Sequence, residues 1–275
     1  MKQYPPIPTV GAASLPAFEG HLWLLELVEG SLLRFQLRES GAIRFGGERG
    51  VYANADAVPR PCRRAVRHVR ERLDREALRA AVDDVTAHTF VGWATHRERI
   101  AYDWDRLPPF LGLDVWAADA GAFRPPDAAE GIFTHLGLEA VNAVAREVRS
   151  RDFDPRSYEL PPSAWYDGPA AGVVIRDKRG NRAQLENSGI SEPSGGPSAA
   201  DASELVDAVA TDRRFERVVA RLDELGREPT VDQLRDRVLE DAYREEHGRL
   251  FVGEGTIDES AVRSEVARRA GQFLG

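Results

Sequence analysis

Three extended segments near the start of the chain decide its expected fold: His21-Leu-Trp-Leu-Leu-Glu-Leu-Val28, Leu32-Leu-Arg-Phe-Gln-Leu-Arg38 and Ala42-Ile-Arg-Phe45. Turn residues, Glu29-Gly30 and Ser40-Gly41, separate them, so the pattern predicts an antiparallel meander. In the second segment leucine and phenylalanine alternate with Arg34, Gln36 and Arg38. One face is therefore expected to join the core, and the other to present cations or to form an ordinary solvated face.

The spacing of the apolar residues then changes from that of a strand to that of a helix. Apolar residues between Pro61 and Val82 recur near helical spacing, which predicts one helix. Eight arginines and three acidic residues lie between Arg60 and Arg79, against a net charge of −8 for the whole chain. The arginines surround much of the helix, so both a phosphate-binding role and a solvated face remain open.

Further along, short apolar runs alternate with helical patterns. The runs at 89–93, 110–116 and 172–176 predict strands, and the stretches 128–136 and 140–148 predict short helices. Because the early strands are consecutive and the helices are interspersed later, the order favours an α+β fold over a regularly alternating α/β fold.

A Ser-, Gly- and Pro-rich stretch from Asn187 to Ser198 predicts a linker. Beyond it lie amphipathic regions at 205–222 and 234–239, the capping pattern Thr230-Val-Asp-Gln233 and a helical run at 259–274. The sequence therefore predicts a first domain at 1–187, a linker at 188–200 and a small helical domain at 201–275.

Composition excludes several classes of protein and site. The chain has 275 residues, of which 42% are hydrophobic, and no apolar run long enough to span a membrane, so we expect a soluble cytoplasmic protein. Cys62 is the single cysteine, which excludes an internal disulfide framework and paired-cysteine zinc sites. The six histidines are scattered; His96 is the most suggestively placed, but no metal ligands are predicted. The only lysines are Lys2 and Lys178.

A series of short segments follows in a fixed order between residues 20 and 186: Glu26-Leu-Val-Glu-Gly30, Leu37-Arg-Glu-Ser-Gly-Ala-Ile-Arg-Phe45, Val91-Gly-Trp93, Phe110-Leu-Gly-Leu-Asp-Val-Trp116, Ala170-Ala-Gly-Val-Val-Ile-Arg176 and Arg182-Ala-Gln-Leu185. Their order and spacing resemble the RNA ligase family of covalent nucleotidyltransferases. In that family a lysine attacks the α-phosphate of ATP, the adenylate passes to an RNA 5′-phosphate, and a 3′-hydroxyl displaces AMP. The resemblance implies an antiparallel-sheet nucleotidyltransferase domain, RNA as a partner, and ATP with Mg²⁺ if the activity is retained.

The departures from the family pattern fall on the residues that carry its chemistry. Leu27 stands at the position of the nucleophilic lysine, and Glu29 at that of an aspartate. Trp93, Leu113, Ala171 and Gln184 replace a glutamate, a phenylalanine, a glutamate and a lysine. Leucine has no lone pair with which to form a phosphoramidate, so no catalytic residue is secure. The resemblance thus implies a catalytically degenerate protein that retains nucleotide or RNA binding.

The resemblance also implies two sets of binding residues. The nucleotide would contact Glu29, Gly30, Arg44, Trp93, Asp114, Arg176 and Gln184, and RNA phosphates would contact Arg34, Arg38, Lys178, Arg179 and Arg182. Two other functions remain open. One is an active RNA ligase with Lys178 as a relocated nucleophile; the other is a module that binds a protein partner through its C-terminal helices.

Overall fold

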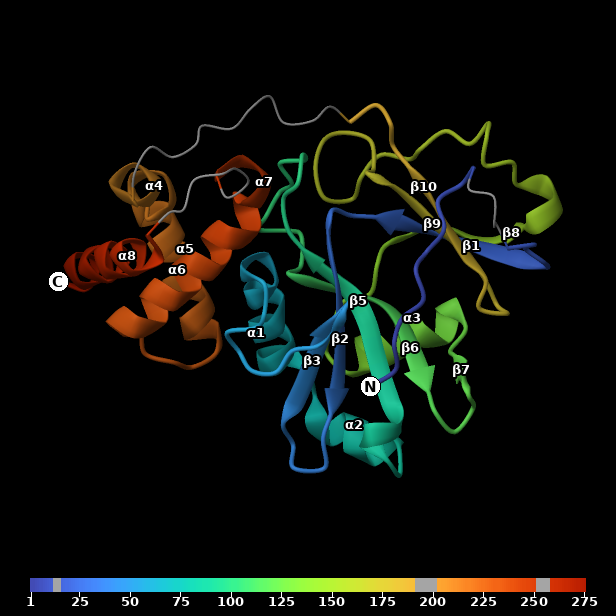
Figure 1. The fold of residues 1–275 in the computed structure, drawn as a ribbon, viewed down its shortest axis with the longest axis horizontal. Helices are drawn as coiled ribbons and strands as arrows, with labels where there is room; N and C mark the ends of the chain where they lie inside the picture. Colours follow the sequence, from blue (N-terminus) through green and yellow to red (C-terminus); the bar gives the residue numbers. More distant parts are fainter. Residues whose placement is uncertain (12–15, 191–201, 251–257) are drawn as a thin grey trace. The chain divides into compact units, whose positions relative to one another are not determined.

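The computed structural model describes residues 1–11, 16–190, 202–250 and 258–275. This part of the chain is α+β, with antiparallel sheets and several helices (Figure 1). It divides into a sheet unit, Met1–Thr95 with Ile100–Ser191, and a helical unit, His96–Arg99 with Glu192–Gly275. Most of the predicted linker lies outside the described residues. No helix in the described ranges is both long and apolar enough to cross a membrane.

Six antiparallel strands form the larger sheet, in the spatial order β4-β3-β2-β5-β6-β7. They are β2 (Gly30–Leu37), β3 (Ile43–Gly47), β4 (Gly50–Val51), β5 (His88–Thr95), β6 (Phe110–Ala117) and β7 (Ala122–Phe123). One face packs against α1 (Arg63–Arg72), α2 (Arg75–Ala81) and α3 (Pro126–His135). Phe35, Phe90 and Phe110 from the strands and Phe133 from α3 form the centre of that core. The predicted strands at 89–93 and 110–116 and the predicted helix at 128–136 are confirmed.

Four antiparallel strands form the smaller sheet, in the order β10-β9-β1-β8. They are β1 (His21–Leu27), β8 (Ala143–Arg149), β9 (Gly172–Asp177) and β10 (Arg182–Glu186). The sheet unit also holds three short 3-10 turns, η1 (Arg60–Cys62), η2 (Val85–Ala87) and η3 (Ser150–Asp152). The strand predicted at 172–176 is confirmed as β9.

The predicted meander is wrong at its first turn. Strand β1 does not pair with β2: it lies at the centre of the smaller sheet, between β8 and β9, while β2 pairs with β3 and β5 in the larger sheet. The chain crosses between the sheets at Glu29-Gly30. Gly30 has a φ of 156°, and a Cβ there would lie 2.4 Å from the carbonyl oxygen of Ala94. A local turn signal cannot distinguish this crossing from a hairpin.

The helix predicted over 61–82 is interrupted. Helix α1 ends before Leu73, whose ψ of 117° is extended, and α2 starts after Asp74. The Asp74 carboxylate accepts hydrogen bonds from the backbone N–H groups of Glu76 and Ala77, which makes it an N-cap. The capping residue therefore divides an apolar pattern that is continuous in the sequence.

The segment 140–148 forms strand β8 and not the predicted helix. Its pairing with β1 contains register irregularities, and Glu147 has a φ of 56°. Val144 and Val148 pack against the apolar cluster of the smaller sheet. Alanine, arginine and glutamate favour helices locally, but here pairing with the edge of β1 overrides this preference.

The helical unit contains α4 (Ala202–Val209), α5 (Asp212–Glu224), α6 (Val231–Glu245), α7 (His247–Leu250) and α8 (Glu259–Leu274). The hydroxyl of Thr230 accepts from the N–H of Gln233, which confirms the predicted capping pattern. The predicted run at 259–274 is confirmed as α8. Phe215, Leu234, Val238 and Val266 are among the residues that form one apolar core.

Candidate functional site

The two sheets of the sheet unit contact each other through one apolar cluster. Trp23 and Leu25 from β1 and Val174 from β9 share this cluster with Val91 and Leu111 from the larger sheet. This shared cluster closes the space between the two sheets with apolar side chains.

The expected nucleophile position, Leu27, and one expected nucleotide-binding position, Trp93, lie at this layer. Leu27, at the end of β1, and Trp93, in β5, are partly buried against the cluster together with Trp104, Trp165 and Tyr166. A leucine at position 27 presents no amine where the RNA ligase pattern has its lysine.

Glu29 and Gly30, two further expected contacts, hold loops and strands together. The Glu29 carboxylate accepts the N–H of Ile100 at 2.8 Å, and the Glu29 N–H donates to the Tyr102 hydroxyl at 3.1 Å. Burial raises the pKa of Tyr102 well above its usual value. Glu29 thus positions the loop at 100–102.

Sequence reasoning did not single out Glu26, which is fully buried. Its carboxylate accepts from Ser163 Oγ at 2.6 Å, from Asn142 Nδ2 at 2.9 Å and from the N–H of Ala164. The sequence contained a signal for this residue, namely a glutamate among apolar residues of a predicted strand. A carboxylate that is buried in such a strand must be paired with hydrogen-bond donors.

Asp114 and Arg176, both expected nucleotide contacts, form a buried ion pair. Arg176 donates to Asp114 Oδ1 at 3.0 Å and to the carbonyl of Leu113 at 2.7 Å. Arg182 lies 3.4 Å from Asp114 Oδ2, and the Tyr4 hydroxyl donates to the same oxygen at 3.1 Å. Burial raises the pKa of Asp114, whereas the two guanidinium groups act to lower it. Arg176 and Arg182 therefore bind a carboxylate inside the protein.

Neither lysine lies at the expected nucleophile position. Lys178 Nζ, which is exposed, pairs with Glu147 Oε1 at 2.8 Å, and this hydrogen bond raises the lysine pKa. The ammonium group of Lys2 lies 4.0 Å from the centre of the Trp116 ring. The Lys178 amine is therefore held in a surface ion pair with Glu147.

Two more expected contacts lie on the surface with partners of their own. Gln184 donates to Glu186 at 2.6 Å, and Arg179 pairs with Glu19 at 2.6 Å. An acidic side chain therefore contacts each of these two residues.

A different group of arginines does share a face. Residue 44 of β3 lies opposite Gln36 of β2, so Arg34, Arg38 and Arg44 point to the same side of the β2–β3 hairpin. Burial lowers the pKa of the Met1 amino group, and the charges of Arg44, Arg34 and Arg38 lower it further.

The three arginines differ in whether their guanidinium groups can reach a ligand in solvent. Arg34 is buried and donates to the carbonyls of Gly47 and Lys2, so the expectation of a cation-presenting residue is wrong for Arg34. Arg38 and Arg44 are exposed, and neither has an ion-pair partner within the described ranges. We call Arg38 and Arg44 the basic face. A cavity of about 480 Å³ adjoins it, lined by Gln36, Arg38, Glu39, Ser40 and Thr86.

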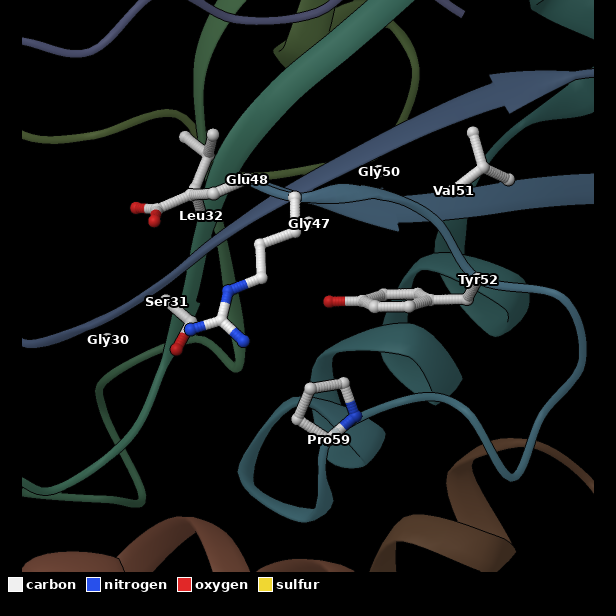
Figure 2. Close-up of a pocket in the computed structure, with 10 residues that line it drawn as sticks. Gly30, Ser31, Leu32, Gly47, Glu48, Gly50, Val51, Tyr52 and Pro59 are labelled. Atoms are coloured by element: carbon white, nitrogen blue, oxygen red, sulfur yellow. The ribbon is translucent and has the colours of Figure 1, made fainter.

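A second cavity, also of about 480 Å³, opens over the β3–β4 turn (Figure 2). It is lined by Gly30, Ser31, Leu32, Gly47, Glu48, Arg49, Gly50, Val51, Tyr52 and Pro59. The Tyr52 ring lies along it, and burial raises the Tyr52 pKa to about 12.

No protein-family model and no curated protein matches the sequence. The chain is similar to solved RNA ligases. One form of an archaeal ATP-dependent RNA ligase is 17% identical with a TM-score of 0.45, over 100% of this chain and 63% of that chain. A mutant RNA ligase of Naegleria gruberi, solved with ATP and Mn, is 13% identical with a TM-score of 0.47, over 62% of this chain and 50% of that chain. The chain thus spans less than two thirds of these ligases. These values carry no information about activity or ligands.

The helical unit brings together one group that the sequence leaves dispersed. His96 and Glu98 lie beside His247, and these side chains place three potential metal-ligand atoms within 4.8 Å of one another. No motif spacing could have found this group, because His247 is remote in sequence from the other two residues.

Proposed function

We propose that this protein binds RNA, or a nucleotide phosphate, on the basic face and does not form a lysyl-adenylate. The resemblance in motif order suggests the ligand class, and the observation that carries the proposal is the pair of exposed arginines, Arg38 and Arg44, on one side of the β2–β3 hairpin. A protein with a net charge of −8 repels polyanions as a whole, so a local group of cations is required for binding.

The positions of the lysine amines support the second part of the proposal, that no lysyl-adenylate forms. Both lysines of the chain have interactions elsewhere, and the position expected for the nucleophile is Leu27. Arginine binds phosphate through several donors but stays protonated, so it cannot replace a nucleophilic lysine.

The first test is adenylation. We expect no covalent AMP on the purified chain after incubation with α-phosphate-labelled ATP and Mg²⁺ or Mn²⁺, because no deprotonatable amine lies at position 27. A denaturing gel and intact mass measure the adduct. Label that survives denaturation would contradict the proposal; its loss in Lys178→Ala would then identify Lys178 as the nucleophile of an active ligase.

The second test reverses the charges of the basic face. In Arg38→Glu/Arg44→Glu we expect the affinity for a 5′-phosphorylated single-stranded RNA to fall by about 10- to 100-fold, since two phosphate contacts become repulsive. The slope of log affinity against log salt should become shallower by about 1.4, at about 0.7 per lost phosphate contact on a single strand. Fluorescence anisotropy of labelled RNA measures both quantities.

The matched control is Arg149→Glu/Arg156→Glu, which makes the same change in net charge at two exposed arginines elsewhere in the sheet unit. Equal losses in both double variants would show only bulk electrostatics and reject the basic face. If the native chain binds no RNA and no ATP, the proposal fails, and the helical unit becomes the place to search for a protein partner.

A further inference from the structure

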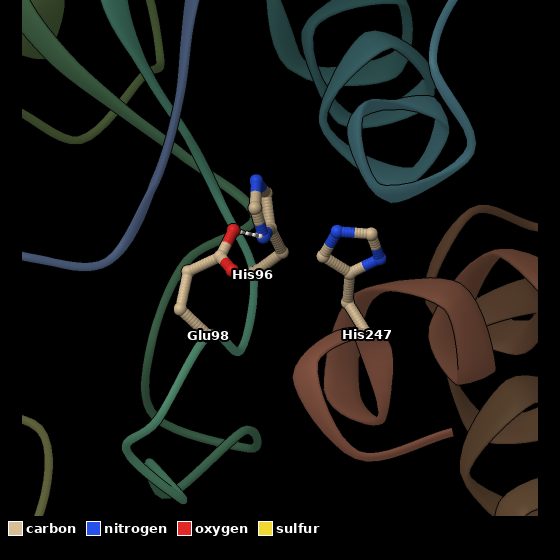
Figure 3. Close-up of side chains that lie close together, drawn as sticks. All are labelled: His96, Glu98 and His247. Carbon is tan, nitrogen blue, oxygen red and sulfur yellow. Dashed lines mark ion pairs between the residues drawn. The ribbon is translucent and has the colours of Figure 1, made fainter. Parts of the chain in front are cut away.

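The side chains of His96, Glu98 and His247 converge within the helical unit (Figure 3). His96 Nδ1 lies 3.2 Å from Glu98 Oε1, and the two imidazole rings are edge to face with centroids 4.9 Å apart. His96 is 1% exposed, while Glu98 and His247 are only partly covered. The three side chains are therefore buried on the side of His96 and accessible to solvent on the side of Glu98 and His247.

Backbone contacts fix the two segments that carry these side chains. The N–H of Arg97 donates to the carbonyl of Arg244 at 2.9 Å, and the N–H of Gly248 donates to the carbonyl of Arg97 at 2.8 Å. A Cβ at residue 248 would lie 1.8 Å from the carbonyl oxygen of Glu98, so only glycine permits this approach. The convergence is thus built into the backbone of the unit.

Two imidazoles and one carboxylate are a donor set for a borderline divalent metal. Magnesium and calcium prefer oxygen ligands only, whereas zinc binds histidine nitrogen and carboxylate oxygen at about 2.0–2.2 Å in a tetrahedron. Those bond lengths put neighbouring ligand atoms about 3.3 Å apart. The distance between His96 Nδ1 and Glu98 Oε1 already matches this spacing. The ligand atom of His247, the first residue of α7, lies at most 4.8 Å from those of the other two residues. It would have to move at most about 1.5 Å closer to reach the spacing of zinc ligands.

We propose that His96, Glu98 and His247 bind one zinc ion. The metal links the segment at 96–99 to the start of α7, and three protein ligands leave the fourth tetrahedral position to water or an anion.

Zinc binding by the untagged full chain, first stripped with a chelator, tests this site. Equilibrium dialysis against Zn²⁺ followed by elemental analysis should give one zinc per chain, and equimolar Mg²⁺ should not displace it. We expect His247→Ala and Glu98→Gln to weaken binding by more than about 100-fold, since even partners outside the ligand set are worth about 10- to 100-fold. Co²⁺ in place of Zn²⁺ should give a four-coordinate visible spectrum that both variants lose.

The control is His135→Ala, which removes an exposed histidine of the sheet unit. It should bind zinc as the native chain does. Glu98→Gln keeps the shape of a half-exposed side chain, and metal-free circular dichroism checks that it folds. The proposal is overturned if the native chain retains no zinc, or if His247→Ala and Glu98→Gln bind it unchanged. Neither result depends on RNA binding.

Discussion

Asp114→Ala should lower the free energy of unfolding of the sheet unit by about 3–5 kcal/mol. Asp114 is 0% exposed, and its carboxylate is the shared partner of Arg176 and Arg182. Both guanidinium groups are nearly inaccessible to water, so removal of the carboxylate leaves two buried positive charges without their counter-charge. The Tyr4 hydroxyl loses its acceptor in the same variant.

Urea unfolding followed by tryptophan fluorescence measures this effect in the full chain. All five tryptophans belong to the sheet unit, so the signal reports that unit alone. The control is Asp119→Ala, because Asp119 pairs with Arg124 at 3.9 Å on the surface and should cost less than about 1 kcal/mol. Equal losses in the two variants would show that Asp114 does not hold a buried charge cluster.

Gly172→Ala should destabilise the same unit by about 2–4 kcal/mol. Gly172 begins β9 with a φ of 156°, and a Cβ there would lie 2.2 Å from the carbonyl oxygen of Leu185 in β10. The obstacle is backbone in a paired strand, so it cannot be relieved by a side-chain rotation. Either β10 moves away or its hydrogen bonds to β9 are lost.

The matched substitution is Gly131→Ala in α3, where a Cβ would meet nothing within 4 Å. Because alanine favours a helix interior over glycine, we expect this variant to be unchanged or more stable by about 0.5–1 kcal/mol. The same fluorescence-detected unfolding compares the two. A Gly172→Ala protein as stable as Gly131→Ala would refute the close approach of β9 and β10.

These two predictions concern positions that fit the RNA ligase pattern, and the structure gives them a role that needs no ligand. A Cβ at Gly30, Gly92 or Gly172 would lie 2.2–2.4 Å from a backbone carbonyl of a neighbouring strand. Asp114 and Arg176 neutralise each other in the interior. Among the positions that depart from the pattern, Glu29 also joins two segments, through its hydrogen bonds with Ile100 and Tyr102.

The sequence alone determined most of the elements. Alternation of apolar and polar residues located β2, a turn signal before an extended segment located β3, apolar runs located β5, β6 and β9, and a capping pattern located the start of α6. These signals are local, since each depends on residues within one or two turns or strand repeats of each other. They were sufficient for the α+β class.

Only the tertiary structure decided which elements meet. It placed β1 in a different sheet from β2, recruited 143–149 as a strand beside β1, and buried Arg34 against the carbonyls of Gly47 and Lys2. It also brought His96 to His247. The physical reason is common to all four: pairing, burial and ligand geometry are set by residues distant in sequence, and their energies exceed the local preferences that a sequence pattern records.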